Sequence, residues 1–372
     1  PVEIAAQLKD FVAHVKKLTR HDKVNFRASS MGGVVTLAYF NEFGYSDVNA
    51  CIFQCCPLLG TAVAGDLLSR KLKLDSRALL DYGTGAYQPA DFESTLLYFL
   101  FNFLYYSGTV DAVLAFGDKL LDELQTKVFD ELMTPVFGTL LGLWAFVPDA
   151  SYEQAKKINL DENTQKGLIA KADYYHYRIQ CRAGEILKGA LDSGMRVMIV
   201  AGYDIQRTPL VESMDNDSDG TVDTMYASAG ATVAPRGETL GEGYKQKVDC
   251  GHNHLSPDGR IDASTCILPE NTWFIKGMLH ANCHDGIMKM YNRLMFSDDN
   301  MNVFSDPLYT QFLQNDKPNL RVIPLGNFAP GEETPQLEAG HSYHDRYERY
   351  AAPVVNKVFG VLDKVRDGLG LN

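Results

Sequence analysis

The sequence predicts an α/β protein with a mostly parallel sheet and flanking helices, and three observations lead to that prediction. A short strand at 24–28 passes through a tight turn into a helix at 31–43, and a buried strand at 48–56 follows. An apolar run at 195–202 and a shorter one at 272–275 have the composition of buried parallel strands. Helical segments lie between these strands, which is the alternation that a parallel sheet requires.

The N-terminal segment, residues 3–19, is predicted to form an amphipathic helix. Its apolar residues recur at helical spacing, and charged residues occupy the other face. A polar break at 20–22 separates this helix from the first strand, and Gly44 ends the helix that follows the turn. The apolar residues of the first helix are Ile4, Leu8, Phe11, Val15 and Leu18.

Residues 61–190 are predicted to form a large helical cap inserted into the α/β core, because strand patterns disappear there. One stretch, Leu96 to Tyr106, contains a single strongly polar residue, Asn102. A bilayer span needs about 20 apolar residues, so we expect no transmembrane segment. A buried helix is favoured over a lipid-facing lid at this stretch. The predicted cap helices are 62–72, 92–106, 110–133, 135–146 and 163–189.

After the cap, the chain returns to core elements and then to a tail. An Asp-rich loop follows the strand at 195–202, and a polar insertion spans 231–265. A helix is predicted at 284–294 and another at 353–366. The predicted division is a core at 1–60 and 191–300, the cap at 61–190, and a loop-rich tail at 301–372.

Composition and charge argue against one class of partner. The chain is 45% hydrophobic and 22% charged, as ordinary globular proteins are. Its net charge of −12 disfavours nucleic-acid binding, which needs concentrated Lys and Arg. The same charge would repel anionic membranes, so any contact with lipid should be apolar. A secreted or cell-surface location is slightly favoured over a cytoplasmic one.

Cysteine usage leaves two interpretations open. Cys250 and Cys266 flank a polar stretch that a disulfide would close, or all seven thiols of the chain stay reduced. Together with His252 and His254, these two cysteines are also soft metal ligands. Their spacing fits no standard zinc frame, so a disulfide or a solvated loop is favoured and no metal site is predicted there.

The most informative stretch is the turn at Ser30. A nucleophile elbow places a serine at a strained bend between strand and helix, so the positions two before and two after must be small. For Ser30 these are Ala28 and Gly32, whereas Ser29 would place larger side chains there. The backbone N–H of Met31 would then point at a developing oxyanion. A Ser-Ser pair that only caps a helix is the alternative.

A nucleophilic serine needs a base, and the base needs an orienting carboxylate. On such a sheet the acid and the histidine follow the serine in that order, each in a loop after a later strand. Asp204 and Asp219 both follow the strand at 195–202. His280 and His284 both follow the next strand, and His284 is preferred because it opens an amphipathic helix. His280 is the alternative base.

The acidic loop also resembles half of a calcium-binding EF-hand loop. Asp215, Asp217, Asp219 and Asp223 match its first, third, fifth and ninth positions. The twelfth position, which should be a bidentate Glu, is Tyr226. Half a loop supplies too few oxygens, so calcium is the minor alternative and no cofactor is predicted.

Four segments together resemble the α/β-hydrolase lipases and esterases, and more loosely the lecithin–cholesterol acyltransferase-like group. Ala-Ser-Ser-Met-Gly-Gly at 28–33 is similar to the Gly-His-Ser-Met-Gly-Gly elbow, with Ala and Ser in place of Gly and His. Pro-Leu-Leu-Gly-Thr at 57–61 and Asp-Gly-Thr-Val at 219–222 are similar to that group's Pro-x-x-Gly segment and acid loop. The histidine segment, 279–288, follows its pattern of Leu-His-x-x-x-His, in which the second His is catalytic.

The resemblance implies a lipase- or esterase-like serine hydrolase with a catalytic triad. It implies Ser30 as nucleophile, Asp219 as acid with Asp204 as the alternative, and His284 as base. The apolar cap, which would act as a lid, suggests a lipid-like ester as substrate and a place in lipid metabolism. Acyl transfer by the same triad, and a non-catalytic protein that binds calcium or a partner, are the alternatives. The apolar stretches of the cap are Leu96–Tyr106, Val113–Phe116 and Val136–Val147.

The resemblance also implies that the sheet is incomplete at its N-terminal side. Such hydrolases have several strands before the elbow, and a loop after an early one gives the second oxyanion donor. Only about two dozen residues precede the elbow strand here. We therefore expect that a preceding segment or a separate chain completes the sheet, and that 1–372 alone exposes a sheet edge. The chain starts at Pro1, so a signal peptide could lie outside it.

Overall fold

The computed structural model describes residues 1–71, 130, 134–207, 211–281, 283–297 and 301–326. The chain divides into two units, and the elements below all belong to the first, which consists of Pro1–Leu74 and Phe116–Pro330. Among the described residues, no helix combines the length and the apolar character needed to cross a bilayer.

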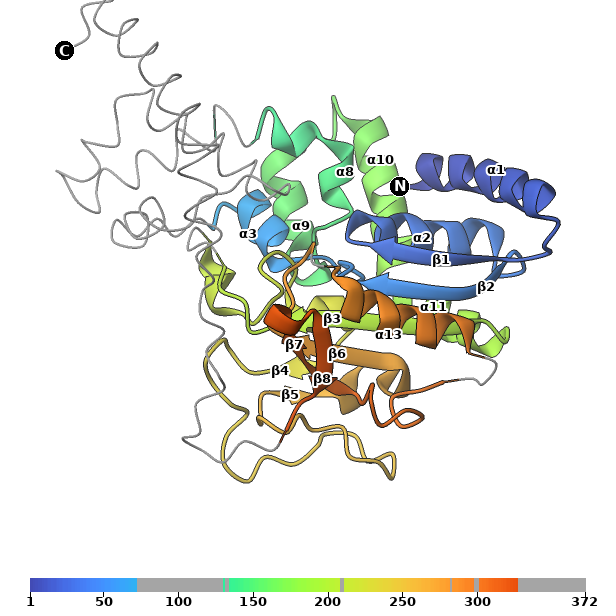
Figure 1. Ribbon diagram of the computed structural model, residues 1–372. Helices are drawn as coiled ribbons and strands as arrows, with labels where there is room; N and C mark the ends of the chain where they lie inside the picture. The colour runs from blue at the N-terminus through green and yellow to red at the C-terminus, as the bar shows by residue number, and fades with distance from the viewer. Residues whose placement is uncertain (72–129, 131–133, 208–210, 282, 298–300, 327–372) are drawn as a thin grey trace, which may run out of the picture. The chain divides into compact units, whose positions relative to one another are not determined.

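The core of this unit is a six-stranded sheet with the order β1-β2-β3-β6-β7-β8 (Figure 1). Neighbouring strands from β1 to β7 are parallel, and β8 runs antiparallel to β7. The prediction of an α/β protein with a mostly parallel sheet is therefore confirmed. The strands are β1 (Val24–Ser29), β2 (Val48–Gln54), β3 (Arg196–Tyr203), β6 (Thr272–Lys276), β7 (Phe312–Asp316) and β8 (Arg321–Pro324).

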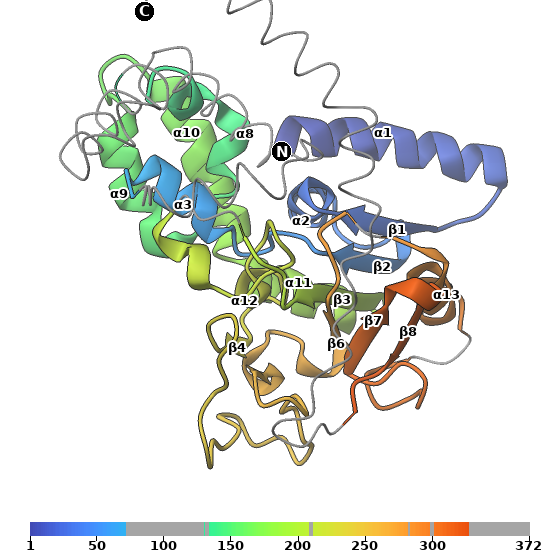
Figure 2. The ribbon, with the colours of Figure 1, turned by 60° about the vertical axis from the view of Figure 1, so that its left-hand side comes forward.

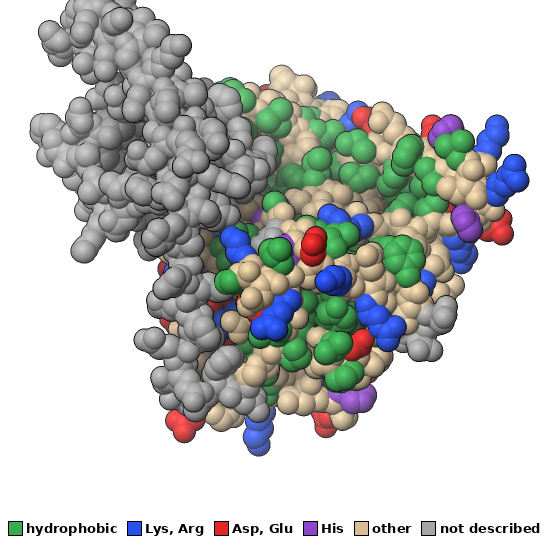
Figure 3. Space-filling view, viewed as in Figure 1, with side chains coloured by type: hydrophobic (Ala, Val, Ile, Leu, Met, Phe, Trp, Pro, Cys, Tyr) green, Lys and Arg blue, Asp and Glu red, His purple; other side chains and the backbone are tan. Residues whose placement is uncertain are grey.

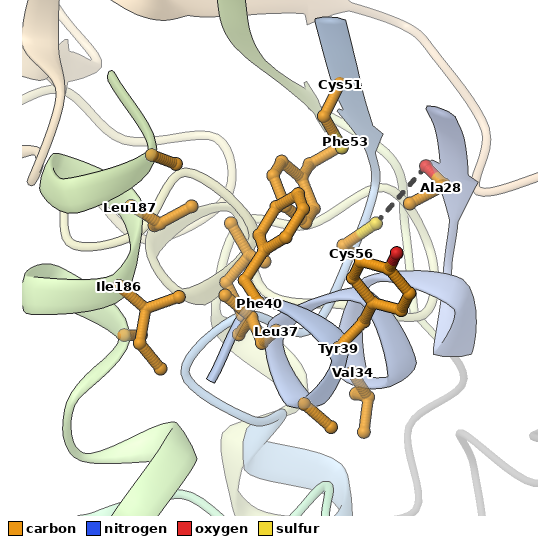
Figure 4. Packing of buried hydrophobic residues seen from close by; sticks show 14 of the residues in the cluster. Ala28, Val34, Leu37, Tyr39, Phe40, Cys51, Phe53, Cys56, Ile186 and Leu187 are labelled. Carbon is orange, nitrogen blue, oxygen red and sulfur yellow. Dashed lines mark hydrogen bonds between the residues drawn. The ribbon is translucent and has the colours of Figure 1, made fainter. Parts of the chain in front are cut away.

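Helices cover both faces of the sheet, and the side chains of each central strand alternate between them. On β2, Cys51 and Phe53 face the layer of α2 (Met31–Phe43) and α11 (Ala183–Asp192). Phe40 of α2 meets Phe53 edge to face, with ring centroids 6.3 Å apart, and Leu187 of α11 lies beside them (Figure 4). The other face of β2 packs against α13 (Asp285–Phe296). Because both faces are covered, central strands have to be apolar throughout, which is why they were predictable.

The first helix, α1 (Val2–Thr19), packs on α2 through a narrower face than its apolar pattern predicts. Ala5 and Val12 are buried, whereas Phe11 and Leu18 are 61% and 68% exposed. Hydrophobic side chains are accordingly visible on the surface around α1 and α2 (Figure 3). β1 is the end strand of the described sheet on the side of α1.

Asp47 connects α1 to the sheet, because Lys9 and Lys16 of the helix both form ion pairs with its carboxylate. Tyr39 of α2 donates to the same carboxylate at 3.2 Å, and the Val24 N–H donates to the Asp47 carbonyl at 2.9 Å. The hydrogen bonds from Lys16 and Lys9 lower the pKa of Asp47 to about 2. Asp47 thus connects α1, α2 and β1.

Replacing Asp47 with asparagine is expected to lower the free energy of unfolding at neutral pH, because the carboxylate is then ionised and paired. Since its pKa is lowered on folding from 3.8 to about 2, this contribution exists above 3.8 and is lost as the pH falls towards 2. Urea unfolding of both proteins at pH 7 and about pH 3 measures it. Asp10→Asn, at an exposed acid of α1, is the control. If the free energy of unfolding of Asp47→Asn differs from that of the parent by the same amount at both pH values, the expectation is wrong.

The described part of the predicted cap is helical, but its helices pack in two different places. α3, α8, α9 and α10 gather to one side of the sheet around the buried residues Trp144 and Tyr152 (Figure 2). α11 instead packs against α2 and β3, so it belongs to the layer on the sheet. The cap predicted for 61–190 therefore includes one helix that packs as core. The helices are α3 (Ala62–Leu68), η2 (Phe137–Thr139), α8 (Leu141–Trp144), α9 (Asp149–Asn159), α10 (Lys166–Tyr175) and the π-helical turn η3 (His176–Gln180).

Several predicted segments lie outside the described residues, namely the helices at 92–106 and 353–366 and most of the one at 110–133. The tail predicted as loop contains β7 and β8, which are too short and too polar to show an apolar pattern. The remaining short elements are η4 (Glu212–Asp215), α12 (Thr224–Ala227), β4 (Thr232–Val233), β5 (Ile261–Asp262), η5 (Ala263–Thr265), η6 (Pro269–Asn271) and η7 (Lys317–Asn319).

All seven cysteines are free, so the Cys250–Cys266 disulfide interpretation is wrong in this structure. Cys250 is exposed and Cys266 is buried. Burial raises the pKa of the Cys266 thiol to about 12. The two thiols therefore occupy different environments.

Candidate active site

The turn at Ser30 has the geometry of a nucleophile elbow. β1 ends at Ser29 and α2 begins at Met31, so Ser30 is the single residue between them, with φ +52°. A Cβ at Gly32 would lie 3.8 Å from that of Ala28, in ordinary contact. A Cβ at Gly33 would lie 2.4 Å from the Cys56 Cβ, so the tightest constraint falls one residue later than predicted.

Left-handed backbone occurs directly after three neighbouring strands of the sheet. Ser30 follows β1, Cys55 follows β2 and Asp204 follows β3, with φ values of +52°, +49° and +64°. This conformation is unfavourable for residues other than glycine and is concentrated at functional sites. Hydrogen bonds across the strand ends hold it, from the Ser30 N–H to the Gln54 carbonyl (3.1 Å) and from the Cys55 N–H to the Val200 carbonyl (2.8 Å). The carboxyl edge of the sheet is thus the strained edge.

Ser30, His280 and Asp219 form a continuous chain of hydrogen bonds at this edge. The Ser30 Oγ lies 2.7 Å from His280 Nε2, and His280 Nδ1 lies 2.9 Å from Asp219 Oδ2. The carboxylate accepts only, so Nδ1 carries the proton in neutral imidazole and Nε2 is free to accept from the serine hydroxyl. This tautomer is the one that general-base catalysis by a histidine requires.

The acid loop fixes the orientation of Asp219. Its Oδ1 accepts hydrogen bonds from the backbone N–H groups of Thr221 (2.9 Å) and Val222 (2.7 Å), which leaves Oδ2 for the histidine. The side chain is fully buried. A Cβ on Gly202, at the end of β3, would lie 2.8 Å from the Asp219 Cβ and 2.4 Å from the Met278 carbonyl oxygen. Glycine at 202 therefore allows the loop that carries Asp219 to pack closely against the loop that follows β6 and carries His280.

The histidine loop is tied to the acid loop by its backbone as well. The His280 N–H donates to the Asp219 carbonyl at 2.9 Å, and the Gly277 N–H donates to the Tyr203 carbonyl at 2.9 Å. These bonds hold the loop that follows β6 against the end of β3. His280 is 8% exposed, so its contact with the serine lies largely out of water.

His284, which the sequence analysis preferred as the base, lies elsewhere. It is the N-cap of α13: its Nδ1 accepts from the Gly286 N–H at 3.1 Å, and its Nε2 donates to Asn315 Oδ1 at 2.7 Å. Nδ1 therefore caps α13, and Nε2 connects the start of this helix to β7. The prediction was right that His284 opens the helix, and that position turns its ring away from the serine. The alternative, His280, is the histidine that contacts Ser30.

Asp204, the alternative acid, is not part of this chain. Its carboxylate pairs with Arg260 at 2.6 Å and approaches Lys276 at 3.7 Å. The Asp204 N–H donates to Asp217 at 2.5 Å. Of the two competing acids, Asp219 is therefore the one in contact with a histidine that reaches the serine.

The four aspartates of the calcium alternative are engaged separately. Asp217 and Asp223 each pair with a buried arginine at 2.9 Å, and Asp219 holds the histidine. Asp215 accepts only through its backbone, from Arg236. Within the described ranges, the side-chain groups close enough to share a metal ion do not include these aspartates. The EF-hand-like spacing here therefore corresponds to a loop that is crosslinked by arginines.

Asp223 and Arg207 form a buried ion pair that sequence reasoning missed. Both side chains are fully buried, with Arg207 Nη1 2.9 Å from Asp223 Oδ1. The second carboxylate oxygen accepts from the Ala62 N–H at 2.7 Å and from the Thr61 hydroxyl at 3.2 Å. Asn216 also donates to Asp223, at 2.9 Å. The pair thus joins the acid loop to the start of α3. Asp217 and Asp219 are buried as well, so Asp223 differs from them in its partner, Arg207, which only the folded chain brings to it.

Two thiols lie next to the triad without forming part of it. Burial, and to a smaller extent the charge of Asp219, raises the pKa of Cys55 and Cys56 well above the ordinary range of a thiol. Both are therefore protonated at neutral pH. A protonated thiol is a poor nucleophile.

Met31, the predicted oxyanion-hole residue, is the first residue of α2. The N–H groups of the first helical turn have no acceptor within the helix, and the helix dipole adds positive potential there. The residue is 53% exposed. Comparison of the chain with protein-family models, curated proteins and solved structures finds no match.

Proposed function

We propose that this protein is a serine hydrolase that cleaves carboxylic esters through an acyl-enzyme. Ser30 is the nucleophile, His280 the general base and acid, and Asp219 the residue that orients the imidazole. The observation that carries the proposal is the pair of hydrogen bonds from Ser30 to His280 (2.7 Å) and from His280 to Asp219 (2.9 Å). The strained backbone of Ser30 supports it, because a serine that merely capped a helix would not need that strain.

In the first half-reaction, Ser30 Oγ attacks the ester carbonyl carbon while His280 Nε2 takes the hydroxyl proton. The tetrahedral intermediate collapses, the ester C–O bond breaks, and the imidazolium returns its proton to the departing alcohol. In the second half-reaction, water attacks the acyl-serine, and the same nitrogen takes its proton and returns it to Ser30. The products are a carboxylic acid and the free enzyme.

The remaining groups fit the requirements of that chemistry. Asp219 stabilises the imidazolium that forms in each half-reaction, at a buried position where its charge is little screened. The Met31 N–H is the donor that we assign to the oxyanion. Such a donor is worth about 10²–10³ in rate when it is aimed at the developing charge.

We further propose a lipid-like, apolar acyl ester as the substrate class. Its support in the described residues is the apolar segment Val136–Val147, where Leu140 is 46% exposed and Val136 44% exposed. A series of esters of increasing acyl length tests this class. A preference for short, polar esters would exclude it while leaving the hydrolase proposal intact.

A fluorophosphonate probe is expected to label the protein at Ser30, because the probe needs a serine activated by a neighbouring base. Ser30→Ala should abolish labelling and lower ester hydrolysis by at least about 10³-fold. Ser29→Ala, at the adjacent serine, is the matched control and should keep most of both. Peptide mapping by mass spectrometry identifies the labelled residue.

Equal labelling of the parent and of Ser30→Ala would refute the assignment of the nucleophile. Failure of the folded parent to react with either probe or esters would refute the enzyme proposal and favour a binding protein. Product analysis with an added alcohol then separates hydrolysis from acyl transfer, since the same triad serves both acceptors.

A further inference from the structure

Three metal-ligating side chains come together in the polar insertion, away from the residues of the triad. Cys250 Sγ and a ring nitrogen of each of His252 and His254 all lie within 4.8 Å of one another. The segment follows the acid loop and lies beside β4 and β5 (Figure 2). Cys250 and His252 are exposed, whereas His254 is fully buried.

The buried histidine has one nitrogen that the protein does not satisfy. His254 Nδ1 lies 2.7 Å from Gln311 Oε1, whereas Nε2 is buried without a hydrogen-bond partner. The Gln311 amide nitrogen donates to the Pro269 carbonyl (2.7 Å) and to the Thr272 carbonyl (3.1 Å), so the oxygen must face the ring. Nδ1 is therefore the protonated nitrogen, and Nε2 presents a lone pair. A buried lone pair without a partner is costly, and a cation would satisfy it.

The second histidine lies close to an acidic residue. His252 Nδ1 lies 3.4 Å from Glu270 Oε1, which leaves its Nε2 to act as a ligand. Metal-binding histidines usually donate their other ring N–H to a carboxylate or a carbonyl oxygen, which fixes the ring and makes it a better ligand. His254 shows this arrangement with the amide oxygen of Gln311, and Glu270 lies at ion-pair distance from His252.

The loop that carries the ligands is braced in this conformation. The side chain of Gln246 donates to the His252 carbonyl at 2.9 Å and accepts from the His254 N–H at 2.8 Å. The ring of Phe304 lies 4.6 Å from that of His252 and 5.5 Å from that of His254. The three ligands are thus held near one another by groups that are not ligands themselves.

We propose that Cys250, His252 and His254 bind a Zn²⁺ ion, with water in the fourth position. One thiolate and two imidazoles form a typical zinc donor set, and binding releases the thiol proton to solvent. Bond lengths of 2.0–2.3 Å place tetrahedral ligand atoms about 3.3–3.6 Å apart, so the ligands must close by roughly 1 Å. Rotation of the two exposed side chains supplies that movement, while His254 stays fixed. Cys266, which the sequence placed with them, lies outside the group.

Zinc at this position would connect the polar insertion to the sheet. Through His254 and Gln311 the ion is connected to the strand start at β7 and to Thr272 on β6. The insertion also carries Arg260, which pairs with Asp217 next to the acid of the triad. We therefore assign the ion a stabilising role, with no part in the chemistry at Ser30.

Zinc binding to the full chain, kept under a non-thiol reductant, is measured by competition with a chromophoric chelator and by thermal unfolding. We expect one equivalent per chain and a rise in Tm of roughly 3–5 °C at a zinc concentration 100 times Kd. Co²⁺ in place of Zn²⁺ should give a thiolate-to-metal charge-transfer band. Cys250→Ser and His252→Asn change exposed side chains, so both variants are expected to fold.

Each of the two variants should lower zinc affinity by at least about 100-fold, since even changes behind a ligand cost 10–100-fold. Cys250→Ser should also abolish the charge-transfer band. Cys181→Ser is the control, because Cys181 with Asp149 and His176 forms the other cysteine–histidine group among the described residues. Both nitrogens of His176 are already hydrogen-bonded, to Gln180 and Asp149, so this variant should bind zinc as the parent does. No binding by the parent, unchanged binding by Cys250→Ser, or its loss in Cys181→Ser would overturn the proposal.

Discussion

Replacing His280 with asparagine is expected to lower kcat/KM for ester hydrolysis by at least about 10³-fold, or ~4 kcal/mol in transition-state free energy. The physical reason is that asparagine cannot take the proton from Ser30, whose oxygen lies 2.7 Å from His280 Nε2. Ester binding should change far less, so the loss falls on kcat. Steady-state kinetics of the purified variant, with circular dichroism to verify folding, measure the effect.

His284→Asn is the matched control for this prediction. Asparagine is a good N-cap, so α13 should keep its start, and the loss of the bond to Asn315 should cost only about 1 kcal/mol of stability. Activity is expected to stay within about tenfold of the parent, since His284 holds the helix and does not touch Ser30. If folded His284→Asn lost as much activity as His280→Asn, or if His280→Asn stayed active, the assignment of the base would be wrong.

Replacing Asp223 with alanine is expected to destabilise the fold by about 3–5 kcal/mol, because it leaves the buried guanidinium of Arg207 without its anion. The same change removes the acceptor for the Ala62 N–H at the start of α3. Thermal or urea unfolding measures the loss. The specific activity of the folded fraction should fall little, since Asp223 does not contact the triad residues.

The pH dependence of this contribution follows from the ion pair. Burial alone would raise the pKa of Asp223, but the charge and hydrogen bond of Arg207 hold that pKa below the ordinary value of 3.8. A carboxyl group whose pKa is lowered on folding stabilises the protein above its unfolded pKa and loses that effect as the pH falls through its folded pKa. The deficit of Asp223→Ala should therefore be full at pH 7 and smaller under strongly acidic conditions.

Glu185→Gln is the comparison at an exposed ion pair. Glu185 pairs with Arg182 at 2.6 Å on the surface of α11, where water screens both charges. Such pairs are worth about 0–1 kcal/mol, so stability should hardly change. If Asp223→Ala and Glu185→Gln lower the free energy of unfolding by equally small amounts, the buried pair does not hold the acid loop in place.

The elbow and the central strands were predictable because their requirements are local. The turn was predicted from small residues at Ala28 and Gly32, although the closest approach of a neighbouring side chain falls at Gly33. A strand covered on both faces must be apolar, so the run at 195–202 indicates its structure directly. Ser30 as the candidate nucleophile followed from that local pattern. β7 and β8 carry no such pattern, since both are short and β8 is the end strand of the described sheet.

The choice between His280 and His284 could not be made from the sequence. The two lie four residues apart and follow the same strand, and the ring that reaches Ser30 is selected by the bond between the His280 N–H and the Asp219 carbonyl. The buried pair of Asp223 and Arg207 likewise depends on which of several buried aspartates the fold places against Arg207. The sequence by itself determined the α/β sheet, the turn and its serine, because backbone strain and burial restrict residue types at single positions. The tertiary structure alone decided the base, the ion pairs and the cluster around His254, because these are contacts between distant segments.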